Sequence, residues 1–122
     1  MTTSEALAGL GSLAQETRLE AFRLLVRRGP EGLSAGAIAE ALQVPASSLS
    51  FHLHQLMHAG LVTQERRSRQ LIYAADYDRM NALVGYLTEN CCAGASCGPV
   101  GAVQCPPPAR PVSARAGGRG RR

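Results

Sequence analysis

The stretch SAGAIAEALQVPASSLSFHLHQLMHAGLV, residues 34–62, carries the strongest structural signal in this 122-residue chain. Its apolar residues recur three and four positions apart in two runs, which is the spacing of a buried helix face. Val44-Pro45 separates the runs, because proline disfavours helical backbone in the residue before it. The pattern predicts a short helix capped by Ser34 and a second helix over residues 46–59 that ends at Gly60.

The same periodicity marks the segments on either side. It predicts helices over about residues 4–13, from Glu16 to Gly29-Pro30, and from Asp76 to about Asn90. Two strand-like runs, LVTQE and QLIYA, lie before the last helix and are joined through RRSR, so we expect a β-hairpin. The fold class is therefore mainly α with a small β-hairpin. The inward side of the helix that begins at Glu16 is predicted to hold Leu19, Phe22, Leu25 and Val26.

Apolar stripes on the two terminal helices exceed what so small a chain can cover. The first helix carries Leu7 and Leu10 on one face. The last helix carries a longer stripe of Met80, Leu83, Val84 and Leu87. A domain of this size buries a limited core, and association supplies further burial. We therefore expect a homodimer that forms through the terminal helices.

Composition bounds the location and the partners. The start, MTTSEALAGLGSLAQ, lacks the basic and apolar regions of a signal peptide, and no window approaches the roughly 18 consecutive apolar residues of a membrane span. We expect a cytosolic protein with no membrane contact. The net charge of +4 is weak evidence for nucleic-acid binding, because five arginines lie after residue 105 and residues 1–105 hold eight arginines against nine acids. The local cluster Arg66, Arg67 and Arg69 either meets phosphates or is a solvated turn.

Two helices joined by a tight break and followed by a hairpin are the arrangement of a winged helix-turn-helix, whose second helix enters the major groove of DNA. The residues that sharpen this prediction are Ile38-Ala39, Leu42, Val44-Pro45, the string Ser47-Ser48-Leu49-Ser50-x-His52-Leu53-x-x-Leu56, and Gly60-Leu61-Val62. With them the chain resembles the ArsR/SmtB family of metal-responsive repressors over about residues 4–92. The resemblance implies a winged-helix homodimer that binds double-stranded operator DNA until a metal or another inducer arrives.

The outer face of the helix over residues 46–59 follows from winding it at about 100° per residue with Leu49 inward. That face holds Ser47, Ser48, Phe51, His54, Gln55 and His58. Serine bonds to bases or phosphates, glutamine reads adenine, and Phe51 either packs on a thymine methyl group or stays partly exposed. His52 lies nearer the inward edge, so support of the helix pair and DNA contact both stay open. The predicted DNA-binding set is Ser47, Ser48, Ser50, Phe51, His52, Gln55, Arg66, Arg67 and Arg69.

Other chemistry on this helix is less well supported. Ser50 and His52 resemble a nucleophile and its base, but no orienting acid or glycine-rich oxyanion loop accompanies them, so we expect no enzyme activity. His54 and His58 have the spacing of a zinc pair, yet no cysteine or carboxylate on that helix completes a site. A polar surface that faces DNA is the better interpretation.

All four cysteines lie in TENCCAGASCGPVGAVQC, residues 88–105. The Cys-x-Cys pair that many arsenic-responsive relatives carry before the recognition helix is absent here, and so is the histidine-containing zinc pattern of the last helix. Cys91-Cys92 followed by Cys97 resembles a smaller group of the family that senses arsenite at the end of the last helix. The resemblance implies trivalent arsenic or antimony as the inducer.

The chemistry of thiolates agrees with this interpretation, because sulfur ligands select soft ions. Trivalent arsenic takes three sulfurs in a pyramid, and the small residues 93–96 allow Cys97 to fold back towards Cys91 and Cys92 once Asn90 has ended the helix. Four alternatives stay open: zinc or cadmium held by all four cysteines, a redox switch, a thiol-based metal chaperone that never touches DNA, and a tail without function. Cys105 lies in a proline-rich run and is left out of the predicted site.

Three parts of the chain are predicted. Residues 1–92 form the winged helix-turn-helix domain for DNA binding and dimerisation, and residues 93–105 form a cysteine-bearing inducer segment. Residues 106–122, PPPARPVSARAGGRGRR, contain one valine as their only sizeable apolar residue. Such a segment buries too little surface to order itself, so we expect a disordered tail.

Overall fold

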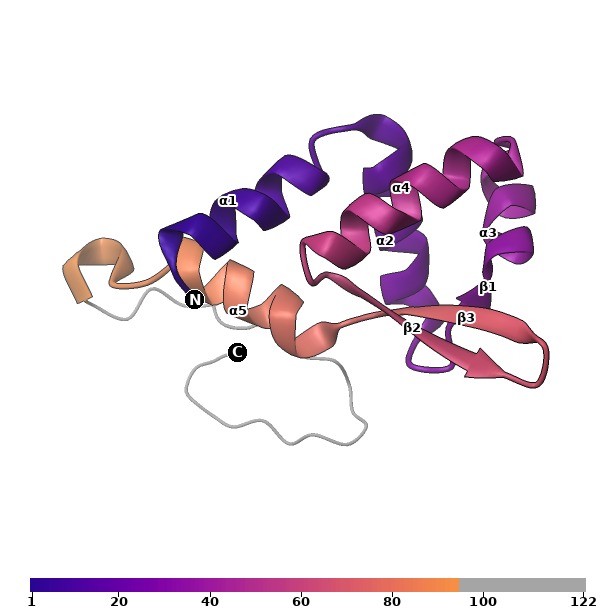
Figure 1. Ribbon diagram of the computed structural model, residues 1–122. Coiled ribbons are helices and arrows are strands. Elements are labelled where there is room, and N and C mark those ends of the chain that lie inside the picture. The colour runs from indigo at the N-terminus through magenta and orange to yellow at the C-terminus, as the bar shows by residue number, and fades with distance from the viewer. Residues whose placement is uncertain (95–122) are drawn as a thin grey trace. The chain divides into compact units, whose positions relative to one another are not determined.

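The computed structural model describes residues 1–94 (Figure 1), so Cys97, Cys105 and the predicted tail lie outside the described residues. The helices are α1 (Thr3–Ser12), α2 (Glu16–Arg28), α3 (Ala35–Leu42), α4 (Ala46–His58) and α5 (Tyr77–Leu87), followed by the short 3-10 turn η1 (Cys91–Gly94). The strands are β1 (Leu33–Ser34), β2 (Val62–Arg67) and β3 (Gln70–Ala75). The predicted fold class, mainly α with a small hairpin, is confirmed.

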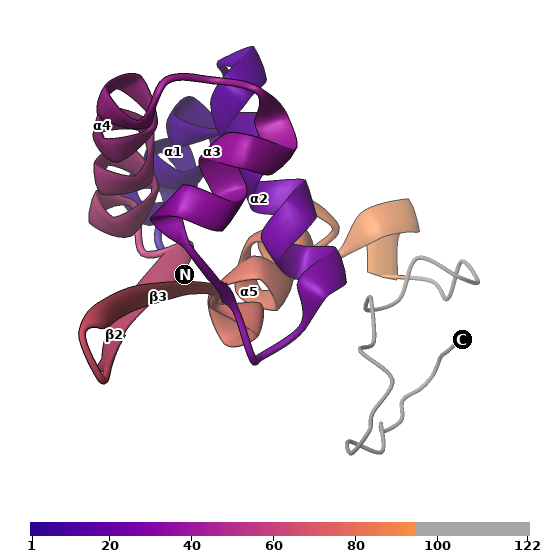
Figure 2. The same cartoon turned by 90° about the vertical axis from the view of Figure 1, so that its right-hand side faces the viewer.

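Residues Thr2–Met80 form one compact unit, and the described residues from Asn81 onward belong to a second. In the first unit α2, α3 and α4 pack together on one side of the hairpin (Figure 2). Its fully buried side chains include Leu25, Ile38, Leu49, Leu53, Leu56 and Leu61. The prediction that Leu19 points inward is wrong, because Leu19 is 43% exposed. Ala21, Phe22 and Leu25 form the buried face of α2 instead.

Side chains and left-handed residues end the helices where the sequence predicts. Ser34 caps α3 by accepting a hydrogen bond from the Ala37 backbone N–H (3.2 Å). An N-terminal cap of this kind contributes about 1 kcal/mol. At the other ends, Gly29 after α2 has a φ of 99° and Gly60 after α4 has a φ of 83°. Both values are easy for glycine and strained for other residues.

A three-stranded antiparallel sheet, in the order β1-β3-β2, replaces the predicted two-stranded hairpin. Strand β1 pairs Leu33 with Tyr73, a contact that the sequence pattern did not reveal. Gly32 makes this approach possible, because it has a φ of 72° and a side chain there would collide with the Tyr73 carbonyl group. At the other end of β3, Arg67 pairs with Gln70, so the hairpin turns within two residues.

Exposed leucines remain on both terminal helices. Helix α1 buries only the small residues Ala6, Gly9 and Ser12, while Leu7 is 64% exposed. Leu87, on α5, is 59% exposed. Leu7 and Leu87 belong to the stripes predicted to need a partner, whereas Leu83 of the second stripe is buried within the chain itself. Within residues 1–94, no helix is long and apolar enough to span a membrane.

Helix α5 ends earlier than predicted, at Leu87 rather than near Asn90. The Thr88 hydroxyl donates to the Val84 carbonyl group (3.0 Å), and residues 88–90 form turns. Asn90 then adopts a left-handed φ of 58°. Asparagine tolerates this conformation better than most residues, so it redirects the chain just before Cys91.

Candidate nucleic-acid interface

Helix α4 presents the predicted polar face to solvent. The burial of Leu49, Leu53 and Leu56 fixes the rotation of the helix about its axis. The six residues predicted on the opposite face are all exposed: Ser47, Ser48, Phe51, His54, Gln55 and His58. Ser50 is exposed as well. The side chains needed to contact a DNA groove are therefore accessible on one helix.

The first turn of α4 is open to a phosphate. The N-cap residue, Pro45, makes no side-chain hydrogen bond to the helix. The first N–H groups of a helix have no partner within the helix itself. Unfilled N–H groups at a helix start favour anions, and the helix dipole adds to the attraction. This end of α4 therefore suits the backbone of a bound duplex.

Phe51 is an exposed apolar side chain on α4, with 58% of its surface accessible. Its ring meets the His52 ring edge-on, with 5.6 Å between the centroids. This contact fixes the direction of the ring without covering it. An apolar ring held on a polar groove-facing surface is suited to contact a thymine methyl group.

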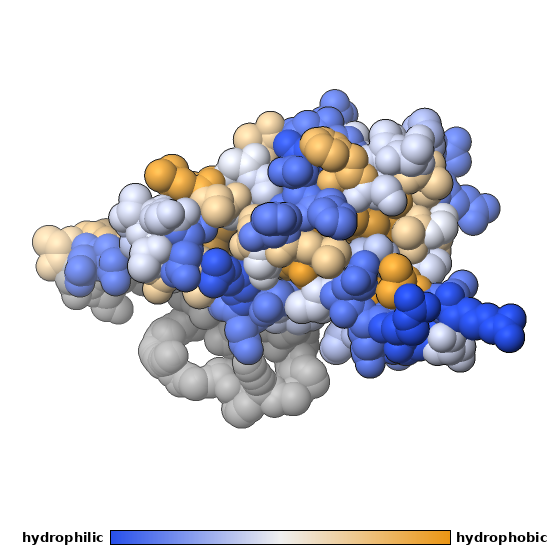
Figure 3. All heavy atoms as spheres, viewed as in Figure 1, coloured by the Kyte–Doolittle hydropathy of each residue, from blue (hydrophilic) through white to orange (hydrophobic). Residues whose placement is uncertain are grey.

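The hairpin tip is the strongly hydrophilic projection visible in Figure 3. Arg66, Arg67 and Arg69 are all exposed there. Arg67 donates to the Glu31 backbone carbonyl group (3.2 Å) and forms an ion pair with Glu65 (3.1 Å). Among the described residues, Arg66 and Arg69 make no such interaction. These two cations are the ones most available to phosphates, whereas Arg67 also ties the hairpin to the segment before β1.

His52 is half-buried and points to the core side of α4. Nη1 of Arg18, on α2, lies 3.1 Å from its Nδ1 atom, and Nε of Arg18 donates to the Ser12 carbonyl group at the end of α1 (2.7 Å). Burial first, and then the Arg18 guanidinium, lower the pKa of His52 below its ordinary value of 6.5. Because a guanidinium only donates, Nδ1 must accept and the ring carries its proton on Nε2. His52 therefore joins α4 to α2, a structural role, and the sequence alone did not reveal its partner Arg18.

Comparisons with known proteins agree with this geometry. Residues 13–65 match a family described as a helix-turn-helix domain. The HTH-type transcriptional regulator YgaV of Escherichia coli (strain K12) is 26% identical over 91 residues, which cover 75% of this chain and 90% of YgaV. An ArsR-like transcriptional regulator from Rhodococcus sp. RHA1 has a TM-score of 0.64 at 27% identity, with 75% of this chain and 82% of that chain covered. The chain contains a helix-turn-helix domain and has the winged helix-turn-helix fold of ArsR-type transcriptional regulators.

A further solved structure shares the fold of this ArsR-type regulator. It is the homodimeric winged helix-turn-helix DNA-binding domain of Mb0332 from Mycobacterium bovis, a possible ArsR-family regulator. The identity is 27% and the TM-score 0.58, with 71% of this chain and 81% of that chain covered. The relatives are transcriptional regulators and not enzymes, in agreement with the expectation that Ser50 and His52 do not form a catalytic pair. The sequence-predicted recognition helix is α4, and the wing is the β2–β3 hairpin.

The thiol segment of the regulator follows α5. Cys91 is half-buried and Cys92 is exposed, and both lie in η1. Cys92 and Ala93 have left-handed φ values of 56° and 57°, so the segment bends sharply directly after the thiol pair. Within residues 1–94, no group of three or more His, Cys, Asp or Glu side chains is placed to hold a metal ion. Cys97, the third predicted ligand, lies beyond the described residues.

Proposed function

We propose that this regulator is a homodimeric repressor whose operator is released when trivalent arsenic or antimony binds the thiolates of Cys91, Cys92 and Cys97. The observation that carries the proposal is the position of the thiol pair, which begins at Cys91, four positions after α5 ends at Leu87. Three thiolates are the ligand set that a soft three-coordinate ion prefers. We expect this chemistry to operate in a reducing cytosol, where disulfides are rare.

The backbone at η1 supports the ligand set. On a regular helix, neighbouring side chains diverge by about 100°. Asn90, Cys92 and Ala93 are left-handed, so the segment leaves helical geometry at the thiol pair. The residues between Cys92 and Cys97 are small, so closing that short loop costs modest chain entropy. Three sulfurs drawn from one short segment can thus surround one ion.

Dimerisation is supported by the leucines that the described chain leaves exposed. Leu7 and Leu10 lie on α1, and Leu87 lies on α5. Association of such surfaces removes apolar area from water at about 25 cal/mol per Å². The relative from Mycobacterium bovis is homodimeric, which favours the same assembly here.

A path from the thiols to DNA runs through α5 itself. The first turn of α5 belongs to the DNA-binding unit, where the Tyr77 hydroxyl donates to the Val26 carbonyl group at the end of α2 (2.9 Å). An ion that reshapes the far end of α5 alters the dimer contacts of that helix. The spacing of the two α4 helices then changes, and both helices must match half-sites about one DNA turn apart.

The test is operator binding, measured by fluorescence anisotropy on promoter DNA of the regulator's own gene during arsenite titration. A coupling of ordinary size predicts that arsenite weakens binding by about 5- to 150-fold. Zinc and hydrogen peroxide are matched titrations for a zinc sensor and a redox switch. Release by zinc alone or by peroxide alone would contradict the proposal, and so would the absence of any specific DNA complex, which is the result expected of a metal chaperone.

A further inference from the structure

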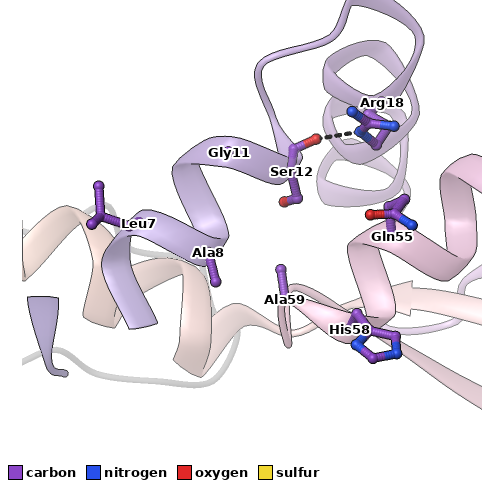
Figure 4. A pocket seen from close by; sticks show the side chains of 8 residues that line it. All are labelled: Leu7, Ala8, Gly11, Ser12, Arg18, Gln55, His58 and Ala59. Carbon is purple, nitrogen blue, oxygen red and sulfur yellow. Dashed lines mark hydrogen bonds between the residues drawn. The ribbon is translucent and has the colours of Figure 1, made fainter. Parts of the chain in front are cut away.

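An open pocket of about 340 Å³ lies between α1, α2 and α4 (Figure 4). Its lining includes the polar side chains of Ser12 from α1, Arg18 from α2, and Gln55 and His58 from α4, and the last three lie at one end of the pocket. Gly11 contributes no side chain, and a Cβ atom built there would meet nothing within 4 Å. The pocket is therefore accessible from solvent next to the recognition helix.

Arg18 brings a positive charge to this pocket without a carboxylate to balance it. None of the three ion pairs formed within residues 1–94 involves Arg18. The two groups that accept hydrogen bonds from Arg18 among the described residues, the Ser12 carbonyl group and the His52 ring, are neutral. A half-buried guanidinium with neutral partners keeps its full charge and attracts an anion.

The two anchoring bonds also orient the guanidinium. Nε is held by the end of α1 and Nη1 by α4, so the side chain has already lost much of its rotational freedom. Among the described residues, no hydrogen bond or ion pair reaches Nη2 of Arg18. A planar guanidinium fixed in this way has a free edge for an oxyanion and pays little further entropy when it binds.

The open pocket lies beside the DNA-facing surface, because Gln55 and His58 belong to the exposed face of α4. The major groove is about 12 Å wide and admits one helix, so backbone phosphates run along both sides of a docked helix. One side of α4 carries α3, and the side with this pocket carries α1 and the start of α2 (Figure 1).

We propose that Arg18 seats one phosphate of the DNA backbone in this pocket, next to α4. In Figure 4 the Gln55 side chain lies between those of Arg18 and His58, so all three polar groups line the same side of the pocket. The inference rests on DNA binding by α4 and not on arsenite. Arg18 thus both joins α2 to His52 on α4 and adds a phosphate contact outside the recognition helix.

The test compares Arg18→Gln with Arg23→Gln on promoter DNA without arsenite. Arg23 is the matched control, because it is an exposed arginine on the same helix and does not line the pocket. Removing a phosphate contact lowers the slope of log affinity against log salt by about 0.9 per protomer. Arg18→Gln is expected to show this loss together with at least about tenfold weaker binding. Arg23→Gln is expected to match wild type, and Arg18→Lys is expected to restore the salt slope.

A second measurement separates a phosphate contact from a purely structural role. Single backbone phosphates of the operator are replaced by neutral methylphosphonates, one at a time. One replacement that weakens wild type but costs Arg18→Gln nothing further would identify the seat. If every replacement costs the variant as much as wild type, or if Arg18→Gln leaves the salt slope unchanged, the inference is overturned.

Inorganic phosphate, added at constant ionic strength to the DNA-free protein, tests the other source of the same anion. Little change in the His58 ring signals is expected at millimolar phosphate. Saturable binding that Arg18→Gln abolishes, without any effect of that variant on the DNA salt slope, would assign the pocket to a free anion and overturn the DNA contact. Failure of arsenite release would leave all of these measurements interpretable, because none of them uses arsenite.

Discussion

The Arg18 guanidinium donates to Nδ1 of His52 from 34 positions away in the sequence, and this bond joins α2 to the recognition helix. It requires a neutral imidazole, since a protonated ring has no lone pair on Nδ1. The accompanying shift of the His52 pKa is downward. Stability should therefore depend on pH through this one ring.

The expected sign follows from proton binding. Because the folded pKa of His52 lies below 6.5, the unfolded chain binds more protons there. The free energy of unfolding should decrease as pH falls through about 6.5 and level off below the folded pKa. The measurement is the urea midpoint between about pH 8 and about pH 5. His52→Asn is the control, because its side-chain oxygen lies near the Nδ1 position and does not titrate. An identical pH dependence in this variant and wild type would refute the assignment.

Replacing single wing arginines should separate the two kinds of cation at the hairpin tip. Arg66→Ala and Arg69→Ala are expected to weaken binding to all duplexes and to lower the salt slope by about one each per protomer. Arg67→Ala should change the slope less, because Arg67 already forms an ion pair with Glu65 and donates to the Glu31 backbone carbonyl group. Anisotropy at several salt concentrations measures all three. Equal slopes for wild type and all three variants would exclude the hairpin from the DNA interface.

Phe51→Ala tests sequence reading. Loss of an apolar contact to a thymine methyl group should cost about 1 kcal/mol on the operator. Replacing individual operator thymines by uracil removes only that methyl group. One such replacement is expected to weaken wild type and to leave the variant unaffected. Since Phe51 is 58% exposed, thermal stability should hardly change. If no thymine couples to Phe51, the ring does not read a methyl group.

Leu7, the more exposed of the two exposed leucines of α1, should hold the dimer together. Leu7→Glu is expected to raise the dimer dissociation constant by about 100-fold, because it buries a charge in an apolar contact. Leu19→Glu is the matched control, since Leu19 is also exposed but lies on α2. Sedimentation velocity over a concentration series measures both. Dissociation caused by Leu19→Glu, with none caused by Leu7→Glu, would place the interface elsewhere.

Local signals in the sequence were sufficient for much of the fold. Ser34 acts through a side-chain bond to a residue three positions away, and Gly29 and Gly60 act through their own backbone, so these roles can be inferred from neighbouring residues. The outer face of α4 followed from helical spacing for the same reason. Leu19 shows the limit of spacing, because it lies at the edge of the buried face of α2.

Long-range contacts could not be inferred in this way. Strand β1 is only two residues long, too short to show a period of two, and it exists because Leu33 meets Tyr73. The bond between Arg18 and His52 likewise depends on how α2 and α4 pack. The proposed thiol site depends on both kinds of information: its residue types can be read from the sequence, while Cys97 lies outside the described residues.

Arsenite release of four cysteine variants from the operator tests the central claim most directly. Cys91→Ser, Cys92→Ser and Cys97→Ser should each bind the operator as wild type does, because the thiols lie outside α4 and the wing. Each variant lacks one of three soft ligands and should lose most of the roughly 5- to 150-fold weakening by arsenite. Cys105→Ser should respond like wild type. If wild-type protein keeps its operator at saturating arsenite while arsenic is bound, or if the three variants release DNA as readily as wild type, the arsenite-release mechanism is contradicted.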